Sequence, residues 1–218
     1  ADEALAALKR EDPEMVDALR RLSDAEPDNP RWAHLLGYIR YRRGGWEIVD
    51  AFQQMSHAIE SGLTNRSAYI YAAESSRQLG NPGRAAGFLR TALRKYPDDP
   101  EILNNLVYSL ACVQDPIPGE TNRFPSVLRD DAGSFISAAQ AHKEALDLLP
   151  RLLRLMPADA NALDTAAFAC LQAGVLAEAK HHTSRLKETS GGNKLLLFKA
   201  DLLEADIALR EGRFRDTL

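Results

Sequence analysis

The chain has little cysteine, no long apolar run and no excess of positive charge, and each absence excludes a class of protein. Two cysteines among 218 residues cannot form the disulfide framework of a small secreted domain. No apolar run approaches the roughly 20 residues of a membrane-spanning helix, so we expect no direct membrane insertion. The 27 lysines and arginines are outnumbered by 31 aspartates and glutamates and are scattered, which argues against a nucleic-acid partner.

Motifs for catalysis, and for binding a metal or a cofactor, are also missing. The chain has no GxSxG, HExxH or P-loop motif, and no GxGxxG after a strand. His181 and His182 are adjacent, so on a helix they point about 100° apart, and they lack further ligands at metal-binding spacing. We expect them on a solvated helix face, and we expect Cys112 and Cys170 to be small core residues. The sequence predicts no enzyme, no metal site and no cofactor.

What the chain does contain is a turn around a proline that recurs. Pro27, Pro97 and Pro157 each end an apolar helical stretch, because proline cannot continue a helix. A glycine then follows Pro27 and Pro157 at the same offset, at Gly44 and Gly174. Recurrence at a fixed period indicates a repeat architecture.

The clearest repeat unit consists of two helices, predicted at 67–79 and 84–96 and separated by a turn over 80–83. Glycine and asparagine in that turn allow a positive φ, and proline stops the first helix. The next unit begins in register, since its apolar stripe repeats the stripe of this one with a period of 34; the stripes are Tyr69, Ala72, Ala73 and Ser76, then Leu103, Leu106, Val107 and Leu110. A helix-turn-helix period of 34 is the length of a tetratricopeptide repeat.

The chain resembles the tetratricopeptide repeat family over most of residues 30–212. The residues that carry the resemblance are Leu36, Gly37 and Gly44, then Ala85, Ala92 and Pro97, and then Ala145, Leu149 and Pro157. The resemblance implies an all-α fold: a right-handed superhelical solenoid of antiparallel helix pairs, with one repeat interrupted by a long insertion. We expect a single solenoid over 1–218, made of a partial repeat at 1–29, repeats at about 30–64, 65–99, 100–159 and 160–190, and a partial repeat at 194–218.

The insertion lies in the third complete repeat. The spacing from Pro97 to Pro157 exceeds one period by 26, and the extra residues fall within 115–140. We expect irregular chain there, with a helix resuming near Ser134 that Pro150 kinks or splits. The insertion has three interpretations: a segment folded into the groove, a projecting binding arm, or a disordered tether.

The first complete repeat allows two registers. Spacing from Pro27 and Gly44 favours Ala33, Leu36, Gly37 and Arg40 as its packing stripe; the more apolar alternative is Trp32, Leu35, Leu36 and Ile39. We favour the first, with two extra residues near 44–46, because the spacing from Pro27 to Pro97 exceeds two periods by two.

The resemblance also implies where a partner would bind, because the first helices of such repeats line a concave groove. The residue six before each turn glycine should face it, and at Tyr38, Phe168 and the equivalent Tyr108 that residue is aromatic, whereas at Glu74 it is not. Aromatic side chains are enriched in interfaces. Packing inside a tightly curved superhelix is the alternative. The candidate groove residues are His34, Tyr38, Tyr41, Ile70, Glu74, Arg77, Asn104, Tyr108, Asp164, Phe168 and Leu171.

The functional hypothesis is a non-catalytic scaffold that binds a protein or peptide partner in this groove. The alternative is a positioning or regulatory segment of a larger multidomain protein, either an enzyme or a secretion or envelope assembly. A final repeat without its second helix leaves apolar surface uncovered, which makes a homo-oligomer possible. The first residues, Ala1-Asp2-Glu3-Ala4, show no signal peptide, and the sequence leaves a cytoplasmic or periplasmic location open.

Overall fold

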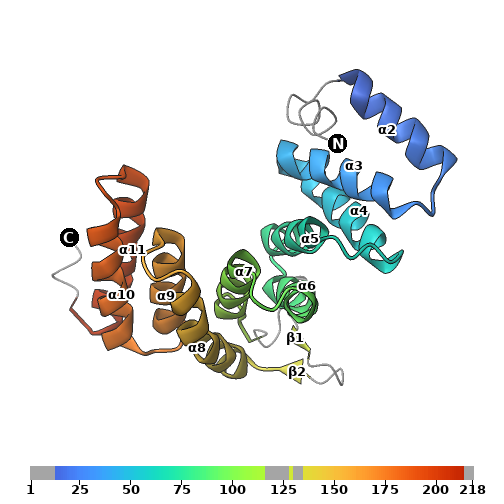
Figure 1. Cartoon of the computed structure of the whole chain (residues 1–218). Helices are drawn as coiled ribbons and strands as arrows, with labels where there is room; N and C mark the ends of the chain where they lie inside the picture. Colours follow the sequence, from blue (N-terminus) through green and yellow to red (C-terminus); the bar gives the residue numbers. More distant parts are fainter. Residues whose placement is uncertain (1–12, 116–127, 130–134, 214–218) are drawn as a thin grey trace. The chain divides into compact units, whose positions relative to one another are not determined.

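The computed structural model describes residues 13–115, 128–129 and 135–213. Over these residues the chain is a succession of packed helices with one short strand pair (Figure 1). It divides into two compact units, Ala1–Ala92 and Leu93–Leu218, called unit 1 and unit 2 below. The all-α solenoid of paired helices that the sequence predicted is the fold observed. None of the described helices combines the length and the apolar character that crossing a membrane requires.

Unit 1 contains successive helices that pack in chain order. These are α2 (Pro13–Ala25), α3 (Pro30–Arg43), the 3-10 turn η1 (Gly45–Glu47), α4 (Ile48–Glu60), α5 (Arg66–Gln78) and α6 (Pro82–Lys95), which crosses the unit boundary. Helix α3 packs on α4, α4 packs on α5, and α3 also contacts α5. A Cβ added at Gly37 would lie 3.1 Å from Gln54 Cβ and from Met55 side-chain atoms, so glycine allows α3 and α4 to approach closely.

The packing stripe of α3 combines the two registers considered above. Ala33, Leu36 and Gly37 are buried, as the favoured register predicts. The fourth position differs, because Ile39 is buried, whereas Arg40 is partly exposed and pairs with Asp50. A guanidinium is stable there because it keeps contact with water and a carboxylate.

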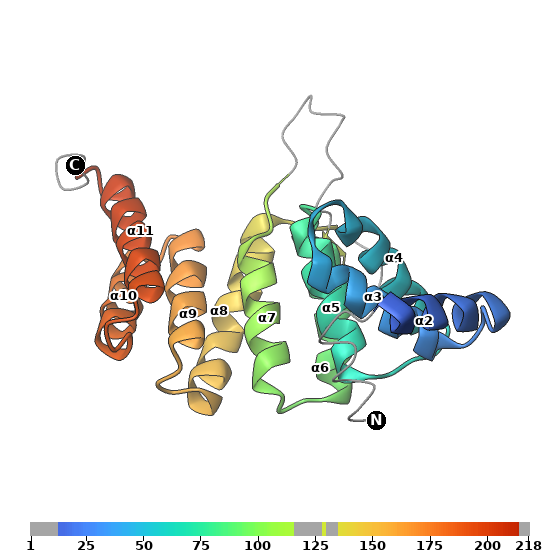
Figure 2. The same cartoon turned by 90° about the horizontal axis from the view of Figure 1, so that it is seen from above.

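The elements of unit 2 are α7 (Pro100–Ala111), β1 (Leu128–Arg129), β2 (Phe135–Ile136), α8 (Ala138–Leu155), α9 (Ala160–Gln172), α10 (Leu176–Thr189) and α11 (Lys194–Arg210). In unit 2 the first helices of successive repeats, α7, α9 and α11, lie side by side, and the second helices α8 and α10 pack against them (Figure 2). Helix α9 contacts α7 and α11, while α8 packs on α7 and α10 packs on α9. Helix α11 packs on its neighbours through Ala200, Leu203 and Ile207, which are all buried.

The insertion is more ordered at its end than the sequence suggested. Strands β1 and β2 pair antiparallel, with Leu128 opposite Ile136. The following helix does not resume near Ser134, which lies outside the described residues, but at Ala138, where Ser137 and Gln140 form a capping box. This S-x-x-Q signal was present in the sequence. Pro150 does not split α8; it lies on the exposed side, where water can bond the carbonyl that proline leaves free.

The recurring proline turns share a contact that ties successive repeats together. A basic side chain from a later helix reaches the carbonyl of each turn proline: His57 Nε2 lies 3.2 Å from Pro27 O, and Arg185 donates to Pro157 O at 2.6 Å. Arg151 does the same for Pro97. The partners are 28 residues apart at Pro157, 30 at Pro27 and 54 at Pro97. Relative to the 28 at Pro157, the separations at Pro27 and Pro97 are longer by 2 and by 26. These are the same numbers of extra residues that the sequence shows between Pro27 and Pro97 and between Pro97 and Pro157.

Candidate partner-binding surfaces

Three tyrosines form one cluster on the first helices of unit 1. The Tyr71 ring lies 5.1 Å from that of Tyr38 and 4.9 Å from that of Tyr41, in both cases tilted. Tyr71 also packs against the buried cluster of Met55, Ala68 and Ala72. All three tyrosines remain partly exposed. The cluster therefore joins the core on one side and offers aromatic surface on the other.

Polar groups of unit 1 flank this tyrosine cluster and are already paired. His34 Nε2 lies 2.9 Å from Ser67 Oγ; because that hydroxyl donates to Asn65 Oδ1 at 2.7 Å, the imidazole N–H is the donor. Burial lowers the pKa of His34. Arg77 Nε donates to Glu74 Oε2 at 3.1 Å, and a second bond makes the pair bidentate. Burial, and then the negative charge of Glu74, raise the pKa of Tyr41.

Unit 2 carries a stacked aromatic pair in the same row. The rings of Tyr108 on α7 and Phe168 on α9 lie 5.2 Å apart with an interplanar angle of 28°. One turn earlier on α7, Oδ1 of Asn104 is shielded from solvent and accepts no hydrogen bond from the described part of the protein. Both rings are partly exposed. This surface therefore combines aromatic area with an acceptor that the described atoms leave without a donor.

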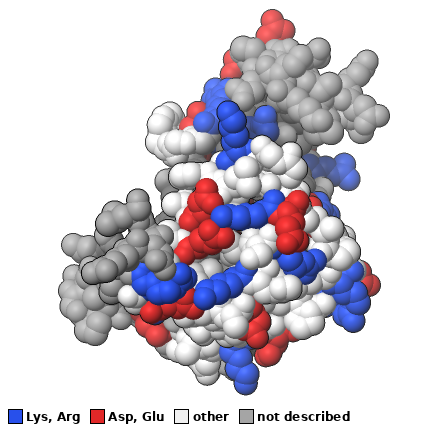
Figure 3. Space-filling model, turned by 90° about the vertical axis from the view of Figure 1, so that its left-hand side faces the viewer, with Lys and Arg blue, Asp and Glu red and all other residues white. Residues whose placement is uncertain are grey.

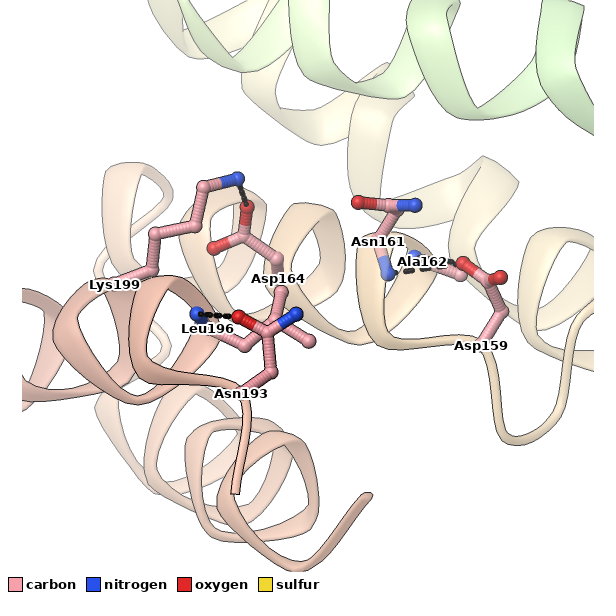
Figure 4. Close-up of polar contacts among 7 residues, drawn as sticks. All are labelled: Asp159, Asn161, Ala162, Asp164, Asn193, Leu196 and Lys199. Carbon is pink, nitrogen blue, oxygen red and sulfur yellow. Dashed lines mark hydrogen bonds and ion pairs between the residues drawn. The ribbon is translucent and has the colours of Figure 1, made fainter. Parts of the chain in front are cut away.

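Ionic contacts in unit 2 connect α9 to α11. Lys199 Nζ lies 2.7 Å from Asp164 Oδ2, and Figure 4 shows the two side chains meeting between the helices.

Asp159 caps α9 by accepting from the N–H groups of Asn161 and Ala162 (Figure 4). Asn193 caps α11 in the same way. The caps fix where each helix begins, and so they fix which residues share a face.

Two predicted groove residues belong to the core. Ile70 is 7% exposed and Leu171 is 1% exposed. The carbonyl of Leu171 accepts a hydrogen bond of 2.6 Å from Arg210 on α11. These two side chains therefore pack against neighbouring helices, which is the alternative that the sequence left open. The predicted groove residues that remain accessible to a partner are His34, Tyr38, Tyr41, Glu74, Arg77, Asn104, Tyr108, Asp164 and Phe168.

Tyr71 and Lys199 complete the two surfaces, and sequence reasoning missed both. Tyr71 lies about 100° around α5 from Ile70, so it was not among the groove residues predicted on that helix, which are Ile70, Glu74 and Arg77. A signal existed, because four of the six tyrosines lie on α3 and α5. Lys199 had no such signal, since its pairing with Asp164 depends on how α9 and α11 lie side by side.

His182 and Cys170 are both packed inside unit 2. In the part of the chain that the structure describes, no three candidate ligands gather at one place. His182 is not on a solvated face as predicted: it is buried, its Nδ1 has no partner among the described atoms, and burial lowers its pKa. The prediction was wrong because α10 turns this position towards its neighbours. Cys170 is a core residue as predicted, and because burial raises its pKa to about 11, its thiol stays protonated at neutral pH.

Comparisons with known proteins agree with this arrangement of helices. The family model for the tetratricopeptide repeat matches residues 66–109, which span α5, α6 and most of α7. A tetratricopeptide repeat protein from Parabacteroides merdae is 16% identical with a TM-score of 0.69, and the match covers 99% of this chain and 73% of that one. No curated protein matches the sequence.

Two further solved structures have the same fold at low identity. MamA from Desulfovibrio magneticus, residue 41 to the end, is 14% identical with a TM-score of 0.61; the match covers 87% of this chain and 89% of that one. A thermophilic TPR protein from Thermus thermophilus is 14% identical with a TM-score of 0.53, covering 86% and 94%. The matched repeat at 66–109, the period of 34 and the helix pairs packed in series show that this chain has the fold of tetratricopeptide repeat proteins.

Proposed function

We propose that the chain is a non-catalytic interaction scaffold whose unit 2 binds a peptide or a partner helix across α7 and α9. The observation that carries the proposal is the stacked and partly exposed pair of Tyr108 and Phe168. Solenoid repeats use the continuous surface of neighbouring helices for binding. Aromatic rings provide a large contact area at a small loss of conformational entropy.

The polar neighbours of this pair indicate what the ligand contributes. Asn104 Oδ1 is shielded and without a donor among the described atoms, which is unfavourable until a hydrogen bond is formed. A backbone or side-chain N–H of a bound peptide supplies that donor. Asp164 is already paired with Lys199, so it supplies little free negative charge. The ligand that fits best is therefore an apolar peptide segment with an N–H directed at Asn104, rather than a highly charged one.

Selection from a displayed library of random peptides tests the proposal without knowledge of the natural partner. Peptides that bind the wild-type chain are titrated against Tyr108→Ala, Phe168→Ala and Asn104→Leu. We expect at least about a tenfold loss of affinity for the aromatic variants, corresponding to about 1.4 kcal/mol. Asn104→Leu should weaken binding less.

Trp46→Ala is the matched control, because Trp46 is 81% exposed and lies on η1 in unit 1. It should bind the selected peptides as the wild type does, and circular dichroism should show unchanged helicity for every variant. Equal affinity of wild type, Tyr108→Ala and Phe168→Ala would eliminate the proposed surface. Failure to select any peptide would do the same.

A further inference from the structure

Helix α11 carries a second apolar stripe on the face away from the core. Its large apolar residues there are exposed: Leu195 by 64%, Phe198 by 59%, Leu202 by 55% and Leu209 by 47%. Together with the half-buried Ala205 they are spaced by three and four residues alternately. That spacing is the a and d pattern with which one helix packs along another. The opposite face holds the buried Ala200, Leu203 and Ile207.

The same face receives a helix one repeat earlier. The caps Asp159 and Asn193 are one repeat period apart, so Phe198, Leu202 and Ala205 correspond to Asp164, Phe168 and Leu171 of α9. Helix α9 uses this face to hold α11, through Asp164 to Lys199 and through the Leu171 carbonyl to Arg210. The stripe on α11 therefore continues a helix-packing interface that is already present in unit 2.

Charges beside the stripe distinguish the orientations in which a second α11 could pack. In a parallel pair, Lys194 faces Lys199 of the second copy and Asp201 faces Asp206, which places like charges together. In an antiparallel pair, one register brings Lys199 beside Asp206 of the second copy, twice by symmetry, and brings Asp201 beside the neutral Ala208. Shifting that register by one heptad opposes Lys199 to Lys199 and Asp201 to Asp201.

The favoured antiparallel register also matches side-chain sizes. It places Leu202 against Ala205 in the two central layers, where a large residue meets a small one, and Phe198 against Leu209 in the layer on either side. Lys199 and Asp206 keep exposed side-chain fractions of 40% and 44%, so both can take part although each also has a partner within its own chain. Figure 3 faces the side of the molecule where α10 and α11 lie, and shows both signs of charge interleaved with uncharged surface.

We propose that two copies of this chain associate through the exposed stripes of α11, packed antiparallel in this register. One helix face buries less than the roughly 800 Å² per partner of a stable complex, so the dimer is weak and reversible. The interface does not include Tyr108 or Phe168, so its failure and the failure of the peptide surface are distinguishable.

Sedimentation velocity over a range of concentrations tests the association. Wild type should shift from monomer to dimer, whereas Leu202→Glu should remain monomeric because it places a carboxylate at the centre of the stripe. Val49→Glu is the matched control: Val49 is 44% exposed on α4 of unit 1 and should leave the dimer intact. A wild type that is monomeric at every concentration overturns the proposal, as does a dimer that Leu202→Glu leaves unchanged.

Charge exchange tests the orientation. Lys199→Glu and Asp206→Lys should each remain monomeric alone, because each symmetric pair then opposes like charges. An equimolar mixture should form a heterodimer, since the introduced glutamate meets the introduced lysine on one side, and the unchanged Asp206 meets the unchanged Lys199 on the other. Recovery in the mixture supports the antiparallel register. Absence of recovery, with both variants folded by circular dichroism, overturns it.

Discussion

In unit 1 the aromatic side chains of the first helices pack on one another and into the core, whereas in unit 2 they form a stacked pair at the surface. Tyr71 contacts Tyr38, Tyr41 and a buried cluster, and its polar neighbours are paired. Tyr108 and Phe168 have beside them a shielded acceptor that no described donor reaches. We therefore expect the aromatic row to serve mainly stability in unit 1 and mainly binding in unit 2.

The largest expected effect is on the stability of unit 1. Tyr71→Ala should lower the free energy of unfolding by about 2 kcal/mol, because it removes a ring that joins two tyrosines to the core. Tyr108→Ala should cost only about 1 kcal/mol, since its ring is partly exposed and stacked on Phe168. Denaturation followed by circular dichroism measures both. Tyr71→Phe, which keeps the ring, is the control, and equal losses for the two alanine variants would break the comparison.

A smaller effect is expected at the proline turns. Arg185→Met removes the donor to the Pro157 carbonyl but keeps much of the apolar stem, so it should cost about 1 kcal/mol. Hydrogen exchange followed by mass spectrometry should show faster exchange in α9 and α10 and no change in α3 or α4. Faster exchange throughout the chain would mean that the contact does more than join neighbouring repeats.

The ion pair between α9 and α11 should contribute still less. Lys199→Met removes the partner of Asp164, and we expect a loss of about 0.5 kcal/mol that disappears in 1 M salt. Chemical denaturation at low and high salt measures it. A loss that is independent of salt would indicate that the lysine stem, rather than its charge, holds α11.

The smallest effect is a dependence of stability on pH from two histidines, the half-buried His34 in unit 1 and the buried His182 in unit 2. Burial lowers the pKa of each, so on acidification the unfolded chain takes up protons first, near its ordinary pKa of about 6.5. Stability should therefore fall as pH drops below about 6.5. His34→Gln and His182→Gln should each reduce that slope. Above about pH 7.5 the difference in free energy of unfolding between variant and wild type should no longer depend on pH. If both variants lose stability on acidification as steeply as the wild type, these histidines are not the cause.

The repeat could be predicted from the sequence because its signals are local. Proline stops a helix whatever surrounds it, so Pro27, Pro97 and Pro157 mark helix ends in the sequence alone. The excesses of 2 and 26 counted between these prolines recur in the separations of His57 and Arg151 from the carbonyls that they reach. The division of the chain into complete and partial repeats, and the peptide-binding role of the row, stay predictions.

The candidate site was predictable only in part, because a helical row does not say which of its members a neighbouring helix covers. Ile70 and Tyr71 are adjacent, yet the first is buried and the second contributes to the tyrosine cluster. His182 was expected in solvent and is buried. These outcomes depend on helix crossing and rotation, which the period alone leaves open.

Backbone stops and apolar spacing act within one or two turns of chain, and so the sequence was enough to define the helix pairs, their period and the position of the insertion. Which side chains meet between helices became visible only in the folded chain: His34 with Ser67, Tyr108 with Phe168, and Lys199 with Asp164. Such contacts join residues 33 to 60 positions apart in sequence, and they depend on how the faces of neighbouring helices are turned towards each other. The exposed stripe of α11 belongs to the same class, since its spacing is visible in the sequence and its exposure is not.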